Sequence, residues 1–168
     1  MQPKVSIIMG SVSDMKVMEK AAKTLDDFEI AFEINALSAH RTPQEVEKFA
    51  RNAQDRGIKV IIAAAGMAAH LPGVVAAMTP LPVIGVPVSA TLDGIDSLLA
   101  IVQMPPGIPV ATVGIDAAQN AALLAVQILS TADNELLKRF SEYKDNLKSK
   151  IIEANIQLAD IKFKYKVN

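Results

Sequence analysis

The sequence contains no cysteine and no tryptophan, and it has few aromatic residues of any kind. Without cysteine, the chain has no disulfides, no thiolate metal or iron–sulfur sites and no cysteine nucleophile. Aromatic residues make up 4% of the chain, which argues against the stacking platforms that bind single-stranded nucleic acids. The 17 basic and 18 acidic residues give a net charge of −1, so no basic surface for a nucleic acid is predicted.

Long hydrophobic runs are also missing. The longest apolar run, around residues 60–69, is interrupted by Gly66 and is too short to span a bilayer. The first residues lead into a strand-like segment without a signal-peptide pattern, which predicts a cytoplasmic protein with no membrane partner. Apolar residues nevertheless make up 51% of the 168 residues, which is enough for a packed core.

Short apolar runs alternate with amphipathic stretches through most of the chain. Strands are predicted over residues 5–9, 30–37, 59–64, 82–86 and 110–113, and helices over 13–26, 42–56, 68–78, 93–102 and 117–129. The second helix opens on Thr42, Pro43 and Glu45, the pattern of a capping box. Continuous apolar strands indicate a parallel sheet that is buried on both faces. We therefore predict an α/β fold, a flavodoxin-like three-layer sandwich with a five-stranded parallel sheet in the order 2-1-3-4-5.

The end of the chain has a different pattern. Residues 133–168 contain neither glycine nor proline and carry one apolar stripe with steps of three and four, which predicts a single helix reaching the C-terminus. A helix of about thirty residues would be roughly 45 Å long. The stripe could pack on its own domain, but this length favours packing on a neighbouring subunit. We expect an α/β nucleotide-binding catalytic domain over residues 1–132 and a helical extension over 133–168.

The loops after the first three strands hold the candidate site, because ligands of such sheets bind beyond the carboxyl ends of the strands. In the first loop, Gly10 allows a tight turn, while Ser11 and Ser13 offer hydroxyls beside a helix start that suits an anion. Asp14 would repel phosphate and fits a sugar hydroxyl better. The alternative is that Ser13 or Asp14 merely caps the helix.

The second and third loops add basic and titratable groups. An arginine at a helix start, Arg41, is electrostatically unfavourable unless an anion binds beside it. The only two histidines, His40 and His70, both follow strand ends, and histidine suits proton transfer near neutral pH. A surface arginine and structural histidines are the alternatives. Neither histidine has a partner at metal-ligand spacing, so no metal site is predicted.

These loops resemble a known family. Residues 9–14 (MGSVSD), 38–43 (SAHRTP), 68–73 (AAHLPG), 82–88 (PVIGVPV), 96–105 (DSLLAIVQMP) and 120–125 (NAALLA) are similar to the class I 5-(carboxyamino)imidazole ribonucleotide mutases of purine biosynthesis. The resemblance implies an isomerase that moves a carboxyl group from the exocyclic amine of a nucleotide monophosphate to carbon 4 of its imidazole. It implies decarboxylation, trapping of carbon dioxide and recarboxylation, without metal, biotin, ATP or another cofactor. It also implies an octamer.

The resemblance assigns roles to particular residues. His40 corresponds to the proton shuttle. The residues that would hold the ribose phosphate are Ser11, Ser13, Asp14, Ser38 and Arg41. Those that would line the carboxylate pocket are Ala65, Gly66, His70 and Leu71. Two residues, Ala64 and Met67, stand where the commonest form of the family has glycine.

Two other functions remain open from the sequence. The first is an enzyme that carboxylates aminoimidazole ribonucleotide directly with carbon dioxide. Relatives of that type lack the HLPG feature, so His70 favours the mutase. The second is a non-catalytic flavodoxin-like nucleotide-binding module, which would have no need of two histidines on the predicted ligand rim.

Overall fold

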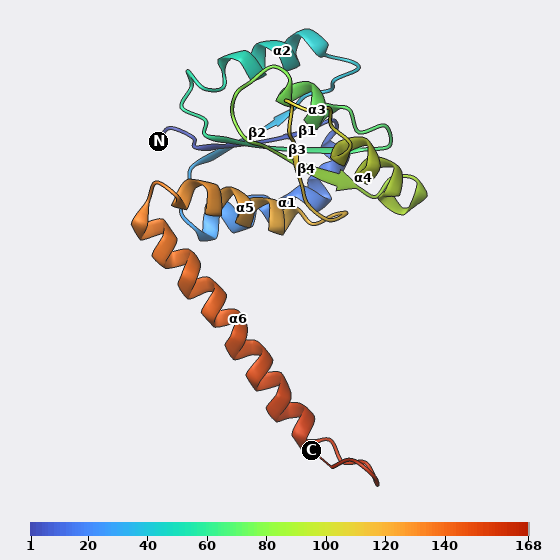
Figure 1. Cartoon of the computed structure of the whole chain (residues 1–168), viewed down its shortest axis with the longest axis vertical. Helices are drawn as coiled ribbons and strands as arrows, with labels where there is room; N and C mark the ends of the chain where they lie inside the picture. The colour runs from blue at the N-terminus through green and yellow to red at the C-terminus, as the bar shows by residue number, and fades with distance from the viewer. Residues whose placement is uncertain (168) are drawn as a thin grey trace. The chain divides into compact units, whose positions relative to one another are not determined.

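The chain divides into two compact units, residues 1–129 and residues 130–168. The computed structural model describes residues 1–167. The first unit contains the whole sheet and the helices around it, and the second consists mainly of the long helix α6 (Asn134–Asp160) (Figure 1). None of the helices in the described part of the chain is long and apolar enough to cross a membrane.

The sheet has five parallel strands in the order β2-β1-β3-β4-β5, which confirms the predicted fold and topology. The strands are β1 (Val5–Met9), β2 (Phe32–Ala36), β3 (Val60–Gly66), β4 (Val83–Val88) and β5 (Ala111–Thr112). The residues of β1 and β4 are all buried, as are those of β3 except its last, so continuous apolar runs mark the centre of the sheet. The edge strand β2 is an exception, because its Ile34 is 42% exposed.

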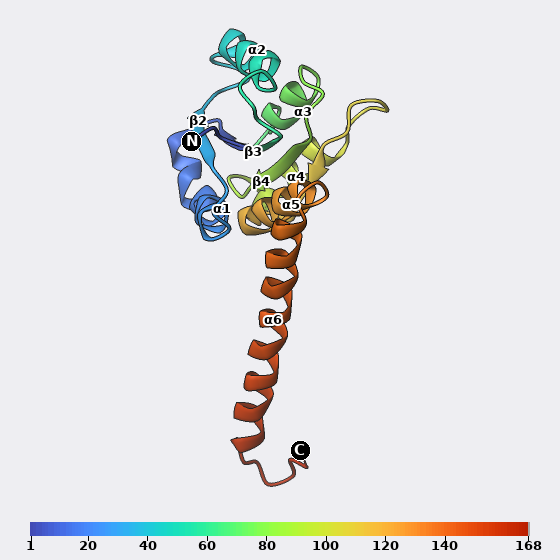
Figure 2. The ribbon, with the colours of Figure 1, turned by 90° about the vertical axis from the view of Figure 1, so that its left-hand side faces the viewer.

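Helices cover both faces of the sheet. They are α1 (Met15–Asp27), α2 (Pro43–Asn52), α3 (Leu71–Ala76), α4 (Ile95–Val102) and α5 (Ala118–Ser130), with short 3-10 turns η1 (Val12–Asp14) and η2 (Leu92–Gly94) before α1 and α4. In both views α1 and α5 lie on one side of the strands, and α2 and α3 on the other (Figure 1 and Figure 2). One buried cluster joins α2, α3 and α4 to the sheet through Val46, Val75 and Ile101. The fold is therefore the predicted three-layer sandwich.

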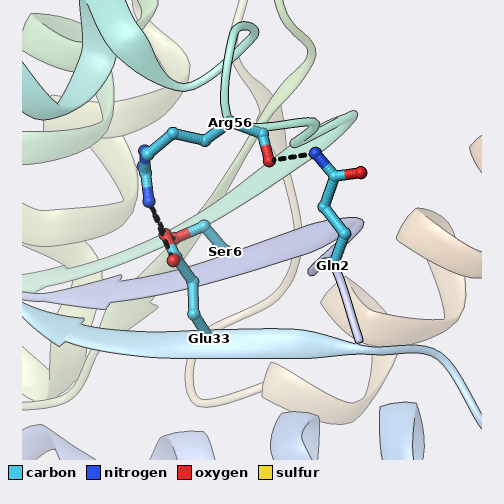
Figure 3. A network of polar contacts seen from close by, with 4 residues as sticks. All are labelled: Gln2, Ser6, Glu33 and Arg56. Carbon is cyan, nitrogen blue, oxygen red and sulfur yellow. Dashed lines mark hydrogen bonds and ion pairs between the residues drawn. The ribbon is translucent and has the colours of Figure 1, made fainter.

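A polar network fixes the edge strand β2 against β1. Glu33 pairs in register with Ser6, whose buried hydroxyl donates to Glu33 Oε1 over 3.0 Å. Arg56 Nη1 donates to both oxygens of the same carboxylate, at 2.7 and 2.8 Å, and Gln2 Nε2 donates to the carbonyl of Arg56 (Figure 3). Because Ser6 and Glu33 are the second residues of their strands, this network lies away from the carboxyl ends, where the loops carry the candidate site.

The structure corrects the predicted start of α2. Thr42 occupies the N-cap position and Pro43 the first turn, as the sequence predicts, but the Thr42 side chain makes no capping hydrogen bond to the helix. Its hydroxyl instead accepts from the Ser38 N–H and lies 3.1 Å from the Ser38 carbonyl, to which it donates. Thr42 therefore organises the loop before the helix rather than closing a capping box.

The C-terminal helix is shorter than predicted. It ends at Asp160, and the next residue, Ile161, has an extended backbone. From this point Ile161, Phe163 and Tyr165 alternate with lysines and are exposed. A period of two does not match the helix repeat, so this pattern explains the early end without any glycine or proline.

Candidate active site

Four loops at the carboxyl ends of the strands form one pocket of about 480 Å³. The pocket contains every residue that the sequence singled out: Ser11, Ser13, Asp14, Ser38, His40, Arg41, Ala65, Gly66, His70 and Leu71. The first six come from the loops after β1 and β2, and the last four from the end of β3 and the start of α3. The reversal of strand order at β1 brings these loops together, because β2 and β3 lie on either side of it.

The loop after β1 is held by its own serines. Ser11 caps the short turn η1, and its hydroxyl oxygen accepts from the Ser13 N–H at 3.3 Å. The Ser13 hydroxyl lies 3.0 Å from Ser11 Oγ and 3.4 Å from a carboxylate oxygen of Asp14. Asp14 stands at the N-cap of α1 but makes no side-chain capping bond. The simple capping interpretation thus applies to Ser11, and not to Ser13 or Asp14.

The loop after β2 directs its arginine back across the site. Thr42 N donates to the Ser38 carbonyl at 2.9 Å, which closes the turn, and Arg41 N donates to Ser38 Oγ at 3.2 Å. The Arg41 guanidinium then donates to the carbonyl of Gly10 at 2.8 Å. The side chain is therefore aligned beside the serine loop, and this contact uses only part of its set of N–H donors. A cation in that position can bind a phosphate or carboxylate.

The loop after β3 has an unusual backbone. Ala69 N donates to the Gly66 carbonyl at 3.0 Å, so residues 66–69 form a tight turn. Within it, Met67 has a φ of 58° and Ala69 a φ of 38°, both in the left-handed region that L-residues rarely adopt. A Cβ on Gly66 would lie 3.1 Å from Ala90 Cβ, so the missing side chain lets this loop approach the loop after β4.

The two histidines are in direct contact. His40 Nε2 and His70 Nδ1 lie 2.6 Å apart, and the two rings are nearly perpendicular. At this distance one ring nitrogen must donate and the other accept, so the pair shares a proton between two loops. The sequence placed both residues on one rim but gave no sign of this contact, which depends on loop conformation. The contact links the loop after β2 to the loop after β3.

The chemistry of the lining, rather than size, distinguishes this pocket. Two other hollows are slightly larger, about 610 and 620 Å³. The first, lined by residues 76–82 and 107–109, has no charged side chain. The second is lined by three acidic residues and no basic side chain. Of these three hollows, only the pocket with Arg41 and the two histidines offers a cation and proton-transfer groups for an anionic substrate.

Sequence reasoning missed part of the lining. Ala90 lines the pocket from the loop after β4, whereas the sequence placed the candidate site only in the loops after the first three strands. Met67, in the loop after β3 that the sequence had already assigned to the site, lines the pocket as well and is 59% exposed. An alanine carries no chemical signal that would mark it as part of a site. Ala90 could therefore not be recognised from residue type alone.

Burial raises the pKa of Asp14 above its ordinary value of 3.8. A backbone hydrogen bond from Ser11, the Ser13 hydroxyl and the charge of Arg41 act in the opposite direction, with smaller effects. A raised carboxyl pKa means that the folded state binds a proton more readily than the unfolded state. The Asp14 contribution to stability is therefore present below about pH 3.8 and is lost as the pH rises through the pKa in the folded protein.

We expect Asp14→Asn to raise the melting temperature modestly at pH 7, because the amide removes the cost of burying a carboxylate. The effect should be a few degrees at most, since the side chain is only half-buried. Thermal unfolding of both proteins from pH 7 down to pH 4 checks this. The difference should shrink toward pH 4, whereas a constant difference would contradict the titration of Asp14.

Comparison with known proteins places this pocket in a family. The model of the family described as AIR carboxylase matches residues 4–150. The N5-carboxyaminoimidazole ribonucleotide mutase of Pyrococcus abyssi is 61% identical over 87% of the chain and 84% of its own length. The phosphoribosylaminoimidazole carboxylase of Schizosaccharomyces pombe is 54% identical over 96% of the chain, which spans 30% of that longer protein.

A solved structure is similar throughout the fold. The crystal structure of Treponema denticola PurE2-S38D matches with a TM-score of 0.85 and 34% identity, over 94% of this chain and 99% of that one. The family match includes all four loops of the pocket. The chain belongs to the AIR carboxylase family.

Proposed function

We propose that this chain is an isomerase of purine biosynthesis that converts 5-carboxyaminoimidazole ribonucleotide to 4-carboxy-5-aminoimidazole ribonucleotide. The Pyrococcus abyssi relative, a mutase by name, is 61% identical to it. The observation that carries the proposal is the meeting of Arg41 with the hydrogen-bonded pair His40–His70 in one pocket. Arg41 supplies the positive charge that a phosphate-bearing substrate needs. The histidine pair supplies the group that takes a proton from carbon and gives one to nitrogen.

The reaction needs one proton to move in each direction. In the first step the bond between nitrogen and the carboxyl carbon breaks, carbon dioxide leaves, and the nitrogen keeps the electron pair and takes a proton from His40. In the second step carbon 4 of the imidazole attacks carbon dioxide and then gives its proton to His40. One histidine therefore acts first as acid and then as base, and each turnover restores it.

His70 orients the shuttle. Its Nδ1 lies 2.6 Å from His40 Nε2, and the two nitrogens form one hydrogen bond. This bond occupies Nε2 of His40 and leaves Nδ1 of that ring free to face the substrate. Ala65, Gly66 and Leu71, with His70, line the part of the pocket that takes the carboxylate. No metal, biotin, ATP or other cofactor is required for these steps.

The remaining residues bind the nucleotide. Arg41, beside the carbonyl of Gly10, lies where it can pair with the ribose phosphate. The hydroxyl groups of Ser11, Ser13 and Ser38 donate hydrogen bonds to the same phosphate. Asp14 accepts from a ribose hydroxyl, because a carboxylate repels phosphate. Binding in one pocket holds the reacting carbon near His40 and supplies orientation.

Direct carboxylation of aminoimidazole ribonucleotide by carbon dioxide is the second candidate, because the Schizosaccharomyces pombe relative carries the name carboxylase. An absorbance assay with the carbamate nucleotide, run beside aminoimidazole ribonucleotide plus bicarbonate, separates the two. We expect rapid turnover with the carbamate. Rapid turnover only with the second mixture would establish the carboxylase instead, and binding without turnover in either mixture would indicate a nucleotide-binding module.

His40→Asn should lose about 10²–10⁴ in turnover, the usual contribution of a general acid–base group, while folding and nucleotide binding persist. His40 is exposed, so its loss leaves no cavity. The matched variant His70→Asn should lose less, because His70 orients the shuttle without carrying the proton to substrate. Steady-state kinetics with binding measured separately checks this pair. Near-normal turnover in His40→Asn with a dead His70→Asn would reverse the two roles.

We propose further that the enzyme is a cytoplasmic homo-oligomer, an octamer, with a catalytic domain over residues 1–132. In this proposal the extension over 133–168 packs on a neighbouring subunit. Along α6, apolar side chains such as Leu147, Ile151 and Leu158 are 42%, 66% and 52% exposed. A helix of 27 residues is about 40 Å long, and exposed apolar side chains over such a length favour an interface.

Removing the residues after Ser149 should leave the α/β unit folded and lower the mass measured by light scattering. Leu158→Glu should also reduce the mass, because it places a charge in the stripe. The adjacent Gln157→Glu adds the same charge outside the stripe and should keep the assembly. Full assembly of the truncated protein would contradict the role given to the extension.

A further inference from the structure

We infer that the Met67 side chain covers the reacting carboxyl group and excludes water from it. This role explains why a methionine occupies a backbone conformation that is strained for any residue except glycine. The inference rests on the proposed function, because it concerns how released carbon dioxide stays in the pocket. It adds a residue to which neither the family nor the relatives' names assign a role. Three features of the described structure support it.

The first feature is the backbone of the turn. Met67 is the first central residue of the turn from Gly66 to Ala69 and has a φ of 58°. The second central residue, Ala68, is outside the left-handed region, and this combination is one that favours glycine at the first position. A methionine there keeps an unfavourable conformation that glycine would relieve. Strain of this kind at a ligand site points to a role for the residue that bears it.

The second feature is that the turn cannot relax. At one end, a Cβ on Gly66 would lie 3.1 Å from Ala90 Cβ and 3.3 Å from the Val88 carbonyl, so the backbone is packed against the next loop. At the other end, Ala69 and Leu71 are almost completely buried. Both anchors fix the turn, which keeps Met67 left-handed and its side chain outside the core.

The third feature is the composition of the lining. Among the described residues that form the pocket, only Met67 and Leu71 have large apolar side chains, and Leu71 is 3% exposed whereas Met67 is 59% exposed. The other apolar residues are alanines. Met67 is thus the one large apolar side chain that can move over a bound ligand, and its unbranched thioether adapts to the surface beneath it.

A cover at this position has a defined purpose in the proposed reaction. When the bond from nitrogen to the carboxyl carbon breaks, the carboxylate becomes carbon dioxide, a small molecule without net charge. Arg41 and the serines cannot hold it by ion pairing, so only the walls of the pocket retain it until carbon 4 attacks. A wall that excludes water also prevents the free carbon dioxide from escaping to solution before carbon 4 attacks it. Met67 closes the side that alanines leave open.

Three variants of the full-length protein separate side chain from backbone. Met67→Leu keeps a large apolar group and the strain, Met67→Ala keeps the strain without the cover, and Met67→Gly removes both. Each is given the carbamate nucleotide in a solution of ¹³C-bicarbonate with carbonic anhydrase. The products are analysed by mass spectrometry for ¹³C in the product carboxyl and for free aminoimidazole ribonucleotide.

We expect the parent and Met67→Leu to retain the substrate's own carboxyl group. Met67→Ala and Met67→Gly should both show a several-fold increase in ¹³C incorporation and in free amine. Leakage in the glycine variant alone would assign the effect to the backbone and overturn the inference, as would retention in all three. A parent enzyme that does not convert the carbamate would instead overturn the proposed function, which keeps the two failures distinct.

Thermal unfolding supplies a readout independent of activity. Met67→Gly should melt at a higher temperature than Met67→Ala, because both lack the cover and only glycine relieves the left-handed backbone. An alanine variant as stable as the glycine variant, or more stable, would show that the backbone at position 67 is not strained and would overturn the inference.

Discussion

The structure depends on a parallel sheet that must be buried on both faces. The central strands β1, β3 and β4 have almost no exposed residue, so their polar backbone groups are satisfied by pairing with the strands on either side. Because the strands are parallel, every connection must carry the chain back to the opposite end of the sheet. The carboxyl ends of all the strands therefore lie at the same end of the sheet. The site is therefore a consequence of how the sheet is built, and its chemistry lies in loops that the sheet holds in place.

Small residues determine how closely these loops and helices approach. A Cβ on Gly85 in β4 would lie 2.4 Å from Ile101 of α4, so the missing side chain lets α4 pack on the sheet. Gly66 does the same for the loop after β3. These glycines allow tight packing of the fold. The pocket, in contrast, combines three unusual features: a left-handed Met67, a half-buried Asp14 and two histidines in contact. Features of this kind concentrate at functional sites.

Much of this arrangement could be read from the sequence, because periodicity and strand order are local or topological properties. The strand Val5–Met9 has the predicted residues, and the strand order follows from right-handed crossovers. The loop residues could be assigned to one rim for the same reason. What could not be predicted depends on the conformation of individual side chains. Thr42 bonds back to Ser38 instead of to its helix, and the 2.6 Å contact between the histidines requires two loops to meet.

The most direct test of the proposed function is a crystal structure of the protein with 4-carboxy-5-aminoimidazole ribonucleotide bound. We predict that the phosphate lies between Arg41 and the Ser11–Ser13 loop, and that carbon 4 of the imidazole faces His40. A nucleotide whose phosphate lies in the uncharged hollow of residues 76–82, or whose imidazole is out of reach of His40, would contradict it.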